Sequence, residues 1–173
     1  MITNEALERV RGWFTGRVPE EWQDQPVEVS VDREEISVLL TLPDVDLPEE
    51  ASAAERDEAR AGRTKAFRED TRGKRISIAR EAERRFERKV SWQVRVGERT
   101  ELFTHVAAPV MTRLRQPQRQ VLDTLVDAGV ARSRSEALAW CVRLVGQHED
   151  DWLGELRDAM SAVADVRAKG PDA

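Results

Sequence analysis

The chain has 173 residues, enough for one compact domain or two small ones. Its residues are 40% hydrophobic and 35% charged but only 5% aromatic, a balance that favours a helix-rich protein with a thin core and long solvated faces. No apolar run approaches the roughly 18 residues that a membrane span needs, and the first residues lack the pattern of a signal peptide. With a single cysteine, Cys141, these features predict a cytoplasmic protein without disulfides or a membrane partner.

The net charge of −5 argues against nucleic-acid binding, but this value is an average over the whole chain. Between His105 and His148 the balance reverses, since arginines outnumber acids there. Because phosphate contacts need only a local patch, the composition leaves DNA binding open. The arginines of this basic segment are Arg113, Arg115, Arg119, Arg132, Arg134 and Arg143.

Residues 1–106 are predicted to form an α+β region. Thr3 or Asn4 can cap a first helix that runs to about Thr15. Alternating or β-branched runs then predict strands, with turn residues between them. The expected strands cover 27–31 and 36–42, joined by a turn at 32–35, and 91–96 and 100–106, joined around Gly97.

Between the two hairpins lie an acidic, proline-containing linker at 43–50 and a helical, highly charged stretch from Glu55 to Lys89. Gly73 leaves open whether this stretch is one long helix or two. A solvated surface helix is the simpler interpretation, because charge runs usually face water. A second surface for nucleic acid or a partner protein is the alternative.

The segment from Val110 to Gln147 has a different organisation. Val110–Arg115 is predicted to be a short strand, and Pro117 fits the first position of a helix. Gly129 can end that helix in the left-handed conformation. Ser133 and Glu136 then have the spacing of a capping box, which predicts a second helix ending near Gly146.

This order of strand, helix, glycine turn and helix resembles the ribbon-helix-helix family, which includes the Arc and methionine repressors and many bacterial antitoxins. The resemblance rests on Arg113-Leu114, on Leu122-Asp123 with Leu125-Val126, on Gly129, and on the run from Arg132 to Leu138. It implies a homodimer in which two strands pair antiparallel and enter the major groove of DNA.

The resemblance also implies which residues touch DNA. With Val110, Thr112 and Leu114 turned inward, Met111 and Arg113 face the bases. Arg113 can grip guanine through O6 and N7, and Met111 can contact a thymine methyl. The start of the second helix suits a phosphate. The expected phosphate contacts are Arg115, Arg132, Ser133, Arg134 and Ser135.

Residues 149–173 are predicted to add a final amphipathic helix. Its acidic start suits the positive end of the helix dipole, and its apolar positions form one stripe. This stripe can pack within the dimer or serve as a docking surface for another protein. Its members are Trp152, Leu153, Leu156, Met160, Val163 and Val166.

Signals of catalysis are missing from the sequence. His105 and His148 lie in unrelated contexts, without the spaced His and Cys set of a zinc site. Glycine-rich phosphate loops and nucleophile elbows are also missing. We therefore expect no catalytic activity, no cofactor and no metal.

Taken together, the sequence predicts three parts: an α+β region at 1–106, a ribbon-helix-helix unit at 107–148 and a terminal helix at 149–173. The expected function is that of a bacterial, homodimeric transcription regulator located at the nucleoid and bound to double-stranded DNA. The alternative is an antitoxin-like or adaptor protein that uses the same dimer as a scaffold for a protein partner.

Overall fold

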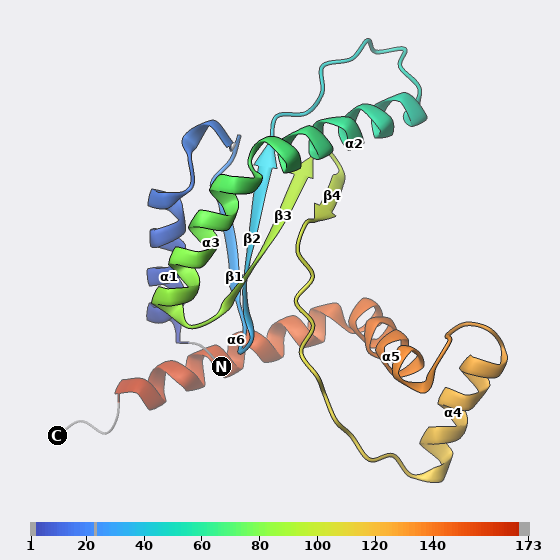
Figure 1. Ribbon diagram of the computed structural model, residues 1–173. Coiled ribbons are helices and arrows are strands. Elements are labelled where there is room, and N and C mark those ends of the chain that lie inside the picture. The colour runs from blue at the N-terminus through green and yellow to red at the C-terminus, as the bar shows by residue number, and fades with distance from the viewer. Residues whose placement is uncertain (1–2, 23, 170–173) are drawn as a thin grey trace. The chain divides into compact units, whose positions relative to one another are not determined.

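The computed structural model describes residues 3–22 and 24–169 (Figure 1). The chain divides into two compact units, Met1–Ala108 and Pro109–Ala173. The fold class is α+β, as the sequence predicted, because the first unit combines helices with a four-stranded sheet and the second is helical. Among the described residues, no helix has both the length and the apolar character needed to cross a membrane.

Helix α1 (Asn4–Arg17) begins where the sequence predicted. The Thr3 side chain accepts a hydrogen bond from the Ala6 N–H at 3.2 Å, which satisfies one donor of the first turn. The helix buries Val10 and Phe14. It is followed by a short 3-10 turn, η1 (Glu20–Trp22).

The sheet has the order β1-β2-β3-β4. Strands β1 (Glu28–Val31) and β2 (Glu35–Leu42) pair antiparallel, as predicted, as do β3 (Lys89–Val96) and β4 (Arg99–Leu102). The second hairpin turns at Gly97, whose φ of 56° is left-handed, but β4 ends at Leu102 and not near residue 106. Strands β2 and β3 pair parallel. They are far apart in the sequence, so the local sequence pattern did not predict this pairing.

Two helices connect the parallel strands, which settles the question that Gly73 left open. A capping box between Ser52 and Glu55 starts α2 (Ala53–Asp70), and α3 (Arg72–Phe86) follows. The break falls at Thr71, and Gly73 lies inside α3. The Thr71 hydroxyl donates to the Phe67 carbonyl and accepts from Arg75 Nε at 2.9 Å, so its side chain stabilises the junction.

The core of the first unit lies between one face of the sheet and the helices that cover it (Figure 1). Period-two alternation turns one set of β2 and β3 side chains toward the helices. Edge-to-face aromatic pairs, Trp13 with Phe86 and Phe14 with Trp92, join helices to one another and to the sheet. The strand residues buried in this core are Ile36, Val38, Leu40, Val90, Trp92, Val94 and Val96.

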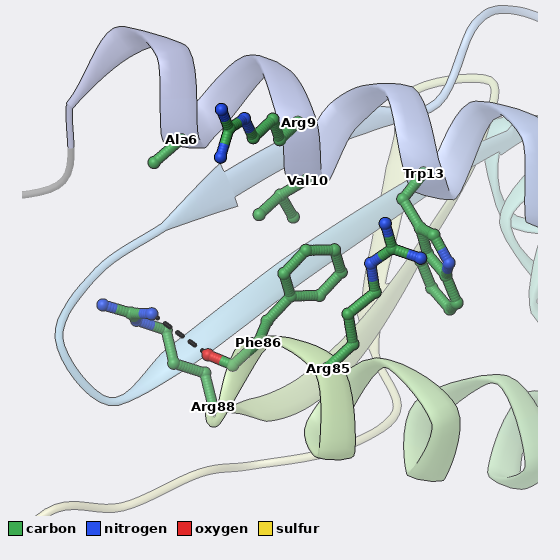
Figure 2. A pocket seen from close by; sticks show the side chains of 7 residues that line it. All are labelled: Ala6, Arg9, Val10, Trp13, Arg85, Phe86 and Arg88. Carbon is green, nitrogen blue, oxygen red and sulfur yellow. Dashed lines mark hydrogen bonds between the residues drawn. The ribbon is translucent and has the colours of Figure 1, made fainter.

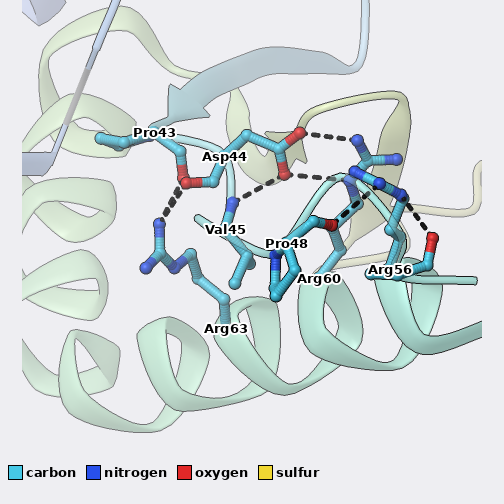
Figure 3. A network of polar contacts seen from close by, with 8 residues as sticks. Pro43, Asp44, Val45, Pro48, Arg56, Arg60 and Arg63 are labelled. Atoms are coloured by element: carbon cyan, nitrogen blue, oxygen red, sulfur yellow. Dashed lines mark hydrogen bonds and ion pairs between the residues drawn. The ribbon is translucent and has the colours of Figure 1, made fainter.

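Arginines of α2 fix the acidic linker at 43–50 onto that helix (Figure 3). Arg60 forms a bidentate pair with Asp44, with Nε to Oδ1 at 2.9 Å and Nη2 to Oδ2 at 2.6 Å. The hydrogen bond from Arg60 holds the pKa of the Asp44 carboxyl below its usual value. Arg63 and Arg56 donate to backbone carbonyls along the same linker, and Arg56 also donates to the Ala51 carbonyl just after it. The linker is therefore ordered by backbone recognition, which its composition alone did not indicate.

The second unit consists of α4 (Gln116–Asp127), α5 (Arg134–His148) and α6 (Asp150–Lys169). Its buried core is small. Leu122, Ala131 and Ala137 are buried, and partly buried side chains from α4, α5 and the preceding segment pack around them. These surrounding side chains are Leu114, Leu125, Val126, Leu138 and Cys141.

Candidate nucleic-acid interface

Residues 110–115 do not form the strand that the sequence predicted. They lie in an irregular segment, and none of the described strands pairs with them. Val110 is 86% exposed and Met111 is fully exposed, so the expected burial of Val110 is wrong for the single chain. Thr112 is also exposed, and only Leu114 turns inward, onto the small core. The physical reason is that a strand needs a hydrogen-bonded neighbour, and the described part of the chain places none beside these residues.

Helix α4 begins at Gln116, one residue before the predicted first position, Pro117. Pro117 lies in the first turn, where its missing N–H costs nothing. The Gln118 side chain accepts a hydrogen bond from the Arg115 N–H at 2.9 Å, and Arg119 Nη1 donates to the Leu114 carbonyl at 2.6 Å. Both contacts tie the exposed segment to the helix that follows it.

The turn after α4 is a complete Schellman motif around Gly129. Gly129 has a φ of 74°, and its N–H donates to the Val126 carbonyl at 3.0 Å. The Val130 N–H donates to the Leu125 carbonyl at 3.0 Å. These are the two bonds that close such a helix end. The prediction that Gly129 ends the helix in the left-handed conformation is therefore confirmed.

The start of α5 differs in one detail from the predicted capping box. The Ser133 hydroxyl accepts from the Glu136 N–H at 3.2 Å, as predicted. The Glu136 carboxylate, however, accepts from the Arg132 N–H at 2.8 Å and not from that of Ser133. The return bond is thus displaced by one residue toward the N-terminus. The helix also continues past Gly146, to His148.

One predicted phosphate contact has a partner within the chain. Arg134 binds the Asp123 carboxylate through two of its nitrogens, with Nε to Oδ1 at 2.6 Å and Nη2 to Oδ2 at 2.8 Å. The pair joins the start of α5 to α4. The hydrogen bond from Arg134 lowers the pKa of Asp123, and the same bond raises the pKa of Arg134. Sequence reasoning missed this pair because the two residues are eleven positions apart.

The remaining predicted DNA contacts are exposed side chains at two places in the second unit. One place is the irregular segment, with Met111, Arg113 and Arg115. The other is the start of α5, with Arg132, Ser133 and Ser135. Both places adjoin α4, because Arg115 caps its beginning and the Gly129 turn leads from its end to α5.

Large apolar side chains of the second unit remain uncovered in the single chain. Outside α6 they lie on the segment before α4, on α4 itself, in the turn and on α5. A soluble monomer rarely exposes so much apolar surface in so few residues. The residues concerned are Val110, Met111, Val121, Val130, Val142, Leu144 and Val145.

The first unit has a groove between α1 and α3 (Figure 2). Its volume is about 580 Å³, and Val10, Trp13 and Phe86 give it an apolar lining. Arginines surround that lining. Arg85 lies 5.6 Å from the centre of the Phe86 ring, and Arg88 Nη1 donates to the Phe86 carbonyl at 3.2 Å. Sequence analysis did not single out this groove, since its residues come from helices some seventy positions apart.

Within residues 3–22 and 24–169, no group of three or more His, Cys, Asp or Glu side chains is placed to hold a metal ion.

Most of the cationic side chains in the stretch from Glu55 to Lys89 make contacts within the first unit. Arg75, for example, is buried and lies 4.8 Å from the centre of the Phe103 ring. Burial lowers the pKa of its guanidinium. This stretch therefore offers less free cationic surface than its composition suggested.

The fold and the site define a two-unit α+β protein with an all-helical C-terminal unit. Comparison of its sequence with known families assigns the chain to one of them. Residues 8–102 match a family described as the Rv1265-like protein N-terminal domain, and residues 115–167 match one described as the Mb1296 C-terminal domain. The chain belongs to the Rv1265-like family. Neither description mentions the ribbon-helix-helix fold.

Its relatives include two mycobacterial proteins. The chain is 61% identical over 160 residues to "Uncharacterized protein Rv1265" of Mycobacterium tuberculosis and to "Uncharacterized protein Mb1296" of Mycobacterium bovis. The match covers 92% of this chain and 69% of each relative. No solved structure matches the chain. The mycobacterial relatives fit the bacterial origin that the sequence predicted.

Proposed function

We propose that the second unit is a ribbon-helix-helix DNA-binding module that works as a homodimer, and that the protein regulates transcription. One observation carries the proposal. Directly before α4 lies a segment with Val110 and Met111 almost wholly exposed, and it leads into two helices joined by a Schellman turn. In a ribbon-helix-helix dimer the corresponding segment pairs with its copy and becomes a strand.

The uncovered apolar surface supports the same proposal. Pairing of two copies would give residues 110–114 the backbone partners that a strand requires. It would also cover apolar side chains such as Val121 on α4 and Val142 on α5, which stay exposed in the single chain. A module of this kind folds and dimerises together, so a small monomer core is what the proposal expects.

DNA would contact the outer face of the paired segment. Arg113 and Met111 are the proposed base contacts, since arginine reads guanine and an apolar side chain reads the thymine methyl. Arg115, Arg132, Ser133 and Ser135 are the proposed phosphate contacts, together with free N–H groups at the start of α5. Arg134 keeps only donors that Asp123 does not use, so its share in binding phosphate is the smallest of the set.

The test is selection of bound sequences from a pool of random duplex DNA, with the purified full chain. We expect a palindromic motif, because a two-fold symmetric dimer reads two half-sites. Retention of random duplex should also fall steeply as salt increases. An enriched motif without two-fold symmetry would contradict the homodimer.

The alternative is that the dimer is a scaffold for a protein partner, as in an antitoxin-like or adaptor protein. This alternative gains support if the chain does not retain duplex DNA even at low salt. In that case the exposed apolar side chains of the second unit would serve contacts between proteins only. The measurement that distinguishes the two is the molar mass of the DNA-free protein. A dimer without DNA retention favours the antitoxin-like or adaptor role.

A further inference from the structure

Helix α6 carries an apolar stripe that the rest of the second unit leaves uncovered. The exposed fractions are 55% for Trp152, 42% for Leu156, 46% for Met160, 43% for Val163 and 70% for Val166. These residues recur at intervals of three or four, so they share one face of the helix. The stripe extends for about 20 Å at 1.5 Å per residue. Single exposed apolar residues are common on proteins, but a continuous stripe of this size marks an interaction surface.

The two end turns of α6 carry opposite charges, and Glu155, Arg157, Asp158 and Asp165 lie between them. The first turn contains Asp150 and Asp151, and the last turn contains Arg167 and Lys169. This arrangement complements the helix dipole. It also gives the helix an acidic end and a basic end, so the orientation of a partner helix matters.

We propose that α6 pairs antiparallel with α6 of a second copy of this chain. When the two stripes overlap fully, Trp152 of one helix lies near Val166 of the other. The acidic first turn of each helix then lies beside the basic last turn of its partner, and the two helix dipoles oppose each other. Parallel pairing would place acid beside acid and base beside base.

The second copy fits this stripe because the same surface supplies both halves. A two-fold axis makes a contact self-complementary, and α6 meets this condition in charge and in apolar pattern. The inference goes beyond DNA binding, since the helix pair forms whether or not the chain contacts DNA.

Disulfide trapping in the full chain tests the pairing and its direction. The native thiol is first removed by Cys141→Ala. Two variants in that background, Trp152→Cys and Val166→Cys, are mixed in equal amounts and oxidised, with a longer tag on one of them to separate the products by size. Antiparallel pairing predicts that the mixed disulfide exceeds either same-site disulfide by more than about fivefold, because bridged Cα atoms must lie within about 7 Å.

Other outcomes overturn the proposal in distinct ways. An excess of same-site disulfides would show that the helices pair in parallel. If neither kind of disulfide forms, α6 does not face its copy, and the stripe contacts a different partner or a different part of the chain.

Matched variants separate pairing from simple damage to the helix. Val163→Glu places a charge in the stripe and should reduce the mixed disulfide at least about tenfold, a loss of about 1.4 kcal/mol of pairing free energy. Ala168→Glu adds the same charge roughly 140° away around the helix and should leave the yield unchanged. If Val163→Glu lowers helicity measured by circular dichroism, Arg167→Glu combined with Lys169→Glu replaces it, because these changes lie at an exposed end.

DNA retention is measured on the same preparations. Trapping of α6 without DNA retention would refute the proposed DNA-binding function and leave the helix pair intact. DNA retention without trapping would refute the helix pair alone.

Discussion

Arg134 at the start of α5 binds Asp123 on α4 through two hydrogen bonds, and this pair fastens together the two ends of the Gly129 turn. The side chains are 60% and 42% exposed. Bidentate geometry between a guanidinium and a carboxylate is the arrangement that makes an exposed ion pair effective. A residue that the sequence assigned to phosphate therefore has a structural task in the single chain.

This pair should give the second unit a pH-dependent stability. The hydrogen bond from Arg134 lowers the pKa of Asp123 in the folded state. A carboxyl with a lowered folded pKa contributes stability above its unfolded pKa, about 3.9, and loses it as pH falls through the folded value. We expect Arg134→Ala to lower the urea midpoint slightly at pH 7 and at pH 5, and to have little effect at pH 2.

Arg132→Ala is the control, because the Arg132 side chain forms no ion pair with the described residues. Its urea midpoint should follow that of the unaltered chain at every pH. An equal loss for Arg134→Ala at pH 7 and at pH 2 would mean that Asp123 does not sense the pair.

Gly129 should be sensitive to substitution because of its backbone conformation alone. With φ at +74°, it adopts a conformation that costs other residues about 1–2 kcal/mol, yet nothing lies within 4 Å of an added Cβ. We expect Gly129→Ala to lower the free energy of unfolding by about 1 kcal/mol, measured by urea titration at a fixed protein concentration.

Gly146 supplies the matched control for that substitution. It lies inside α5 with helical backbone, and an added Cβ there also meets nothing within 4 Å. Because alanine favours the helix, Gly146→Ala should raise stability by up to about 1 kcal/mol. A loss at both positions would show that the new methyl group, and not the backbone at Gly129, is responsible.

Removal of the Thr64 hydroxyl in α2 should stabilise the protein. The residue is fully buried, and its Oγ1 has no hydrogen-bond partner in the described part of the chain. Thr64→Val keeps the shape and removes a buried polar atom, so we expect the free energy of unfolding to rise by about 1 kcal/mol. A decrease would show that the hydroxyl is satisfied in solution.

Removal of the Thr71 hydroxyl should have the opposite effect and destabilise the protein. Its hydroxyl donates to the Phe67 carbonyl and accepts from Arg75 Nε at 2.9 Å. Thr71→Val leaves a buried guanidinium without one of its acceptors, so we expect a loss of about 1–3 kcal/mol. Equal effects at Thr64 and Thr71 would contradict the assignment of these contacts.

Local signals in the sequence were enough for most helix boundaries. Pro117, Gly129 and Ser133 each act on the backbone within a few residues. Gly129 and Ser133 have their predicted roles, and Pro117 is the second residue of α4, one position later than predicted. Thr3 also has its predicted role, at the start of α1. Capping and turn chemistry is short-ranged, which is why a single sequence reveals it.

Contacts between distant segments could not be predicted from such local signals. The parallel pairing of β2 with β3, and the binding of Asp123 by Arg134, depend on how the chain closes in space. The predicted strand at 110–115 did not form for a related reason, since a strand depends on a neighbour and local propensity cannot supply one.

The DNA-binding proposal predicts two different effects from two arginines. Arg132→Ala should weaken retention of all duplexes alike and reduce the salt slope by about 2, one phosphate contact from each subunit of a dimer. Arg113→Ala should instead reduce discrimination between the selected motif and random duplex, by about 1–3 kcal/mol for each lost bidentate contact. Fluorescence anisotropy with labelled duplexes at several salt concentrations measures both.

Arg143→Ala controls for charge in these measurements. Arg143 is an exposed cation of α5 in the same basic segment, but it lies outside the proposed contacts. Its removal should change the salt slope less than removal of Arg132 does, because a charge beyond direct contact is screened within a Debye length of about 10 Å. Identical slopes for the three variants would mean that the basic segment binds DNA without the proposed register, and the assignment of Arg113 to the bases would then be wrong.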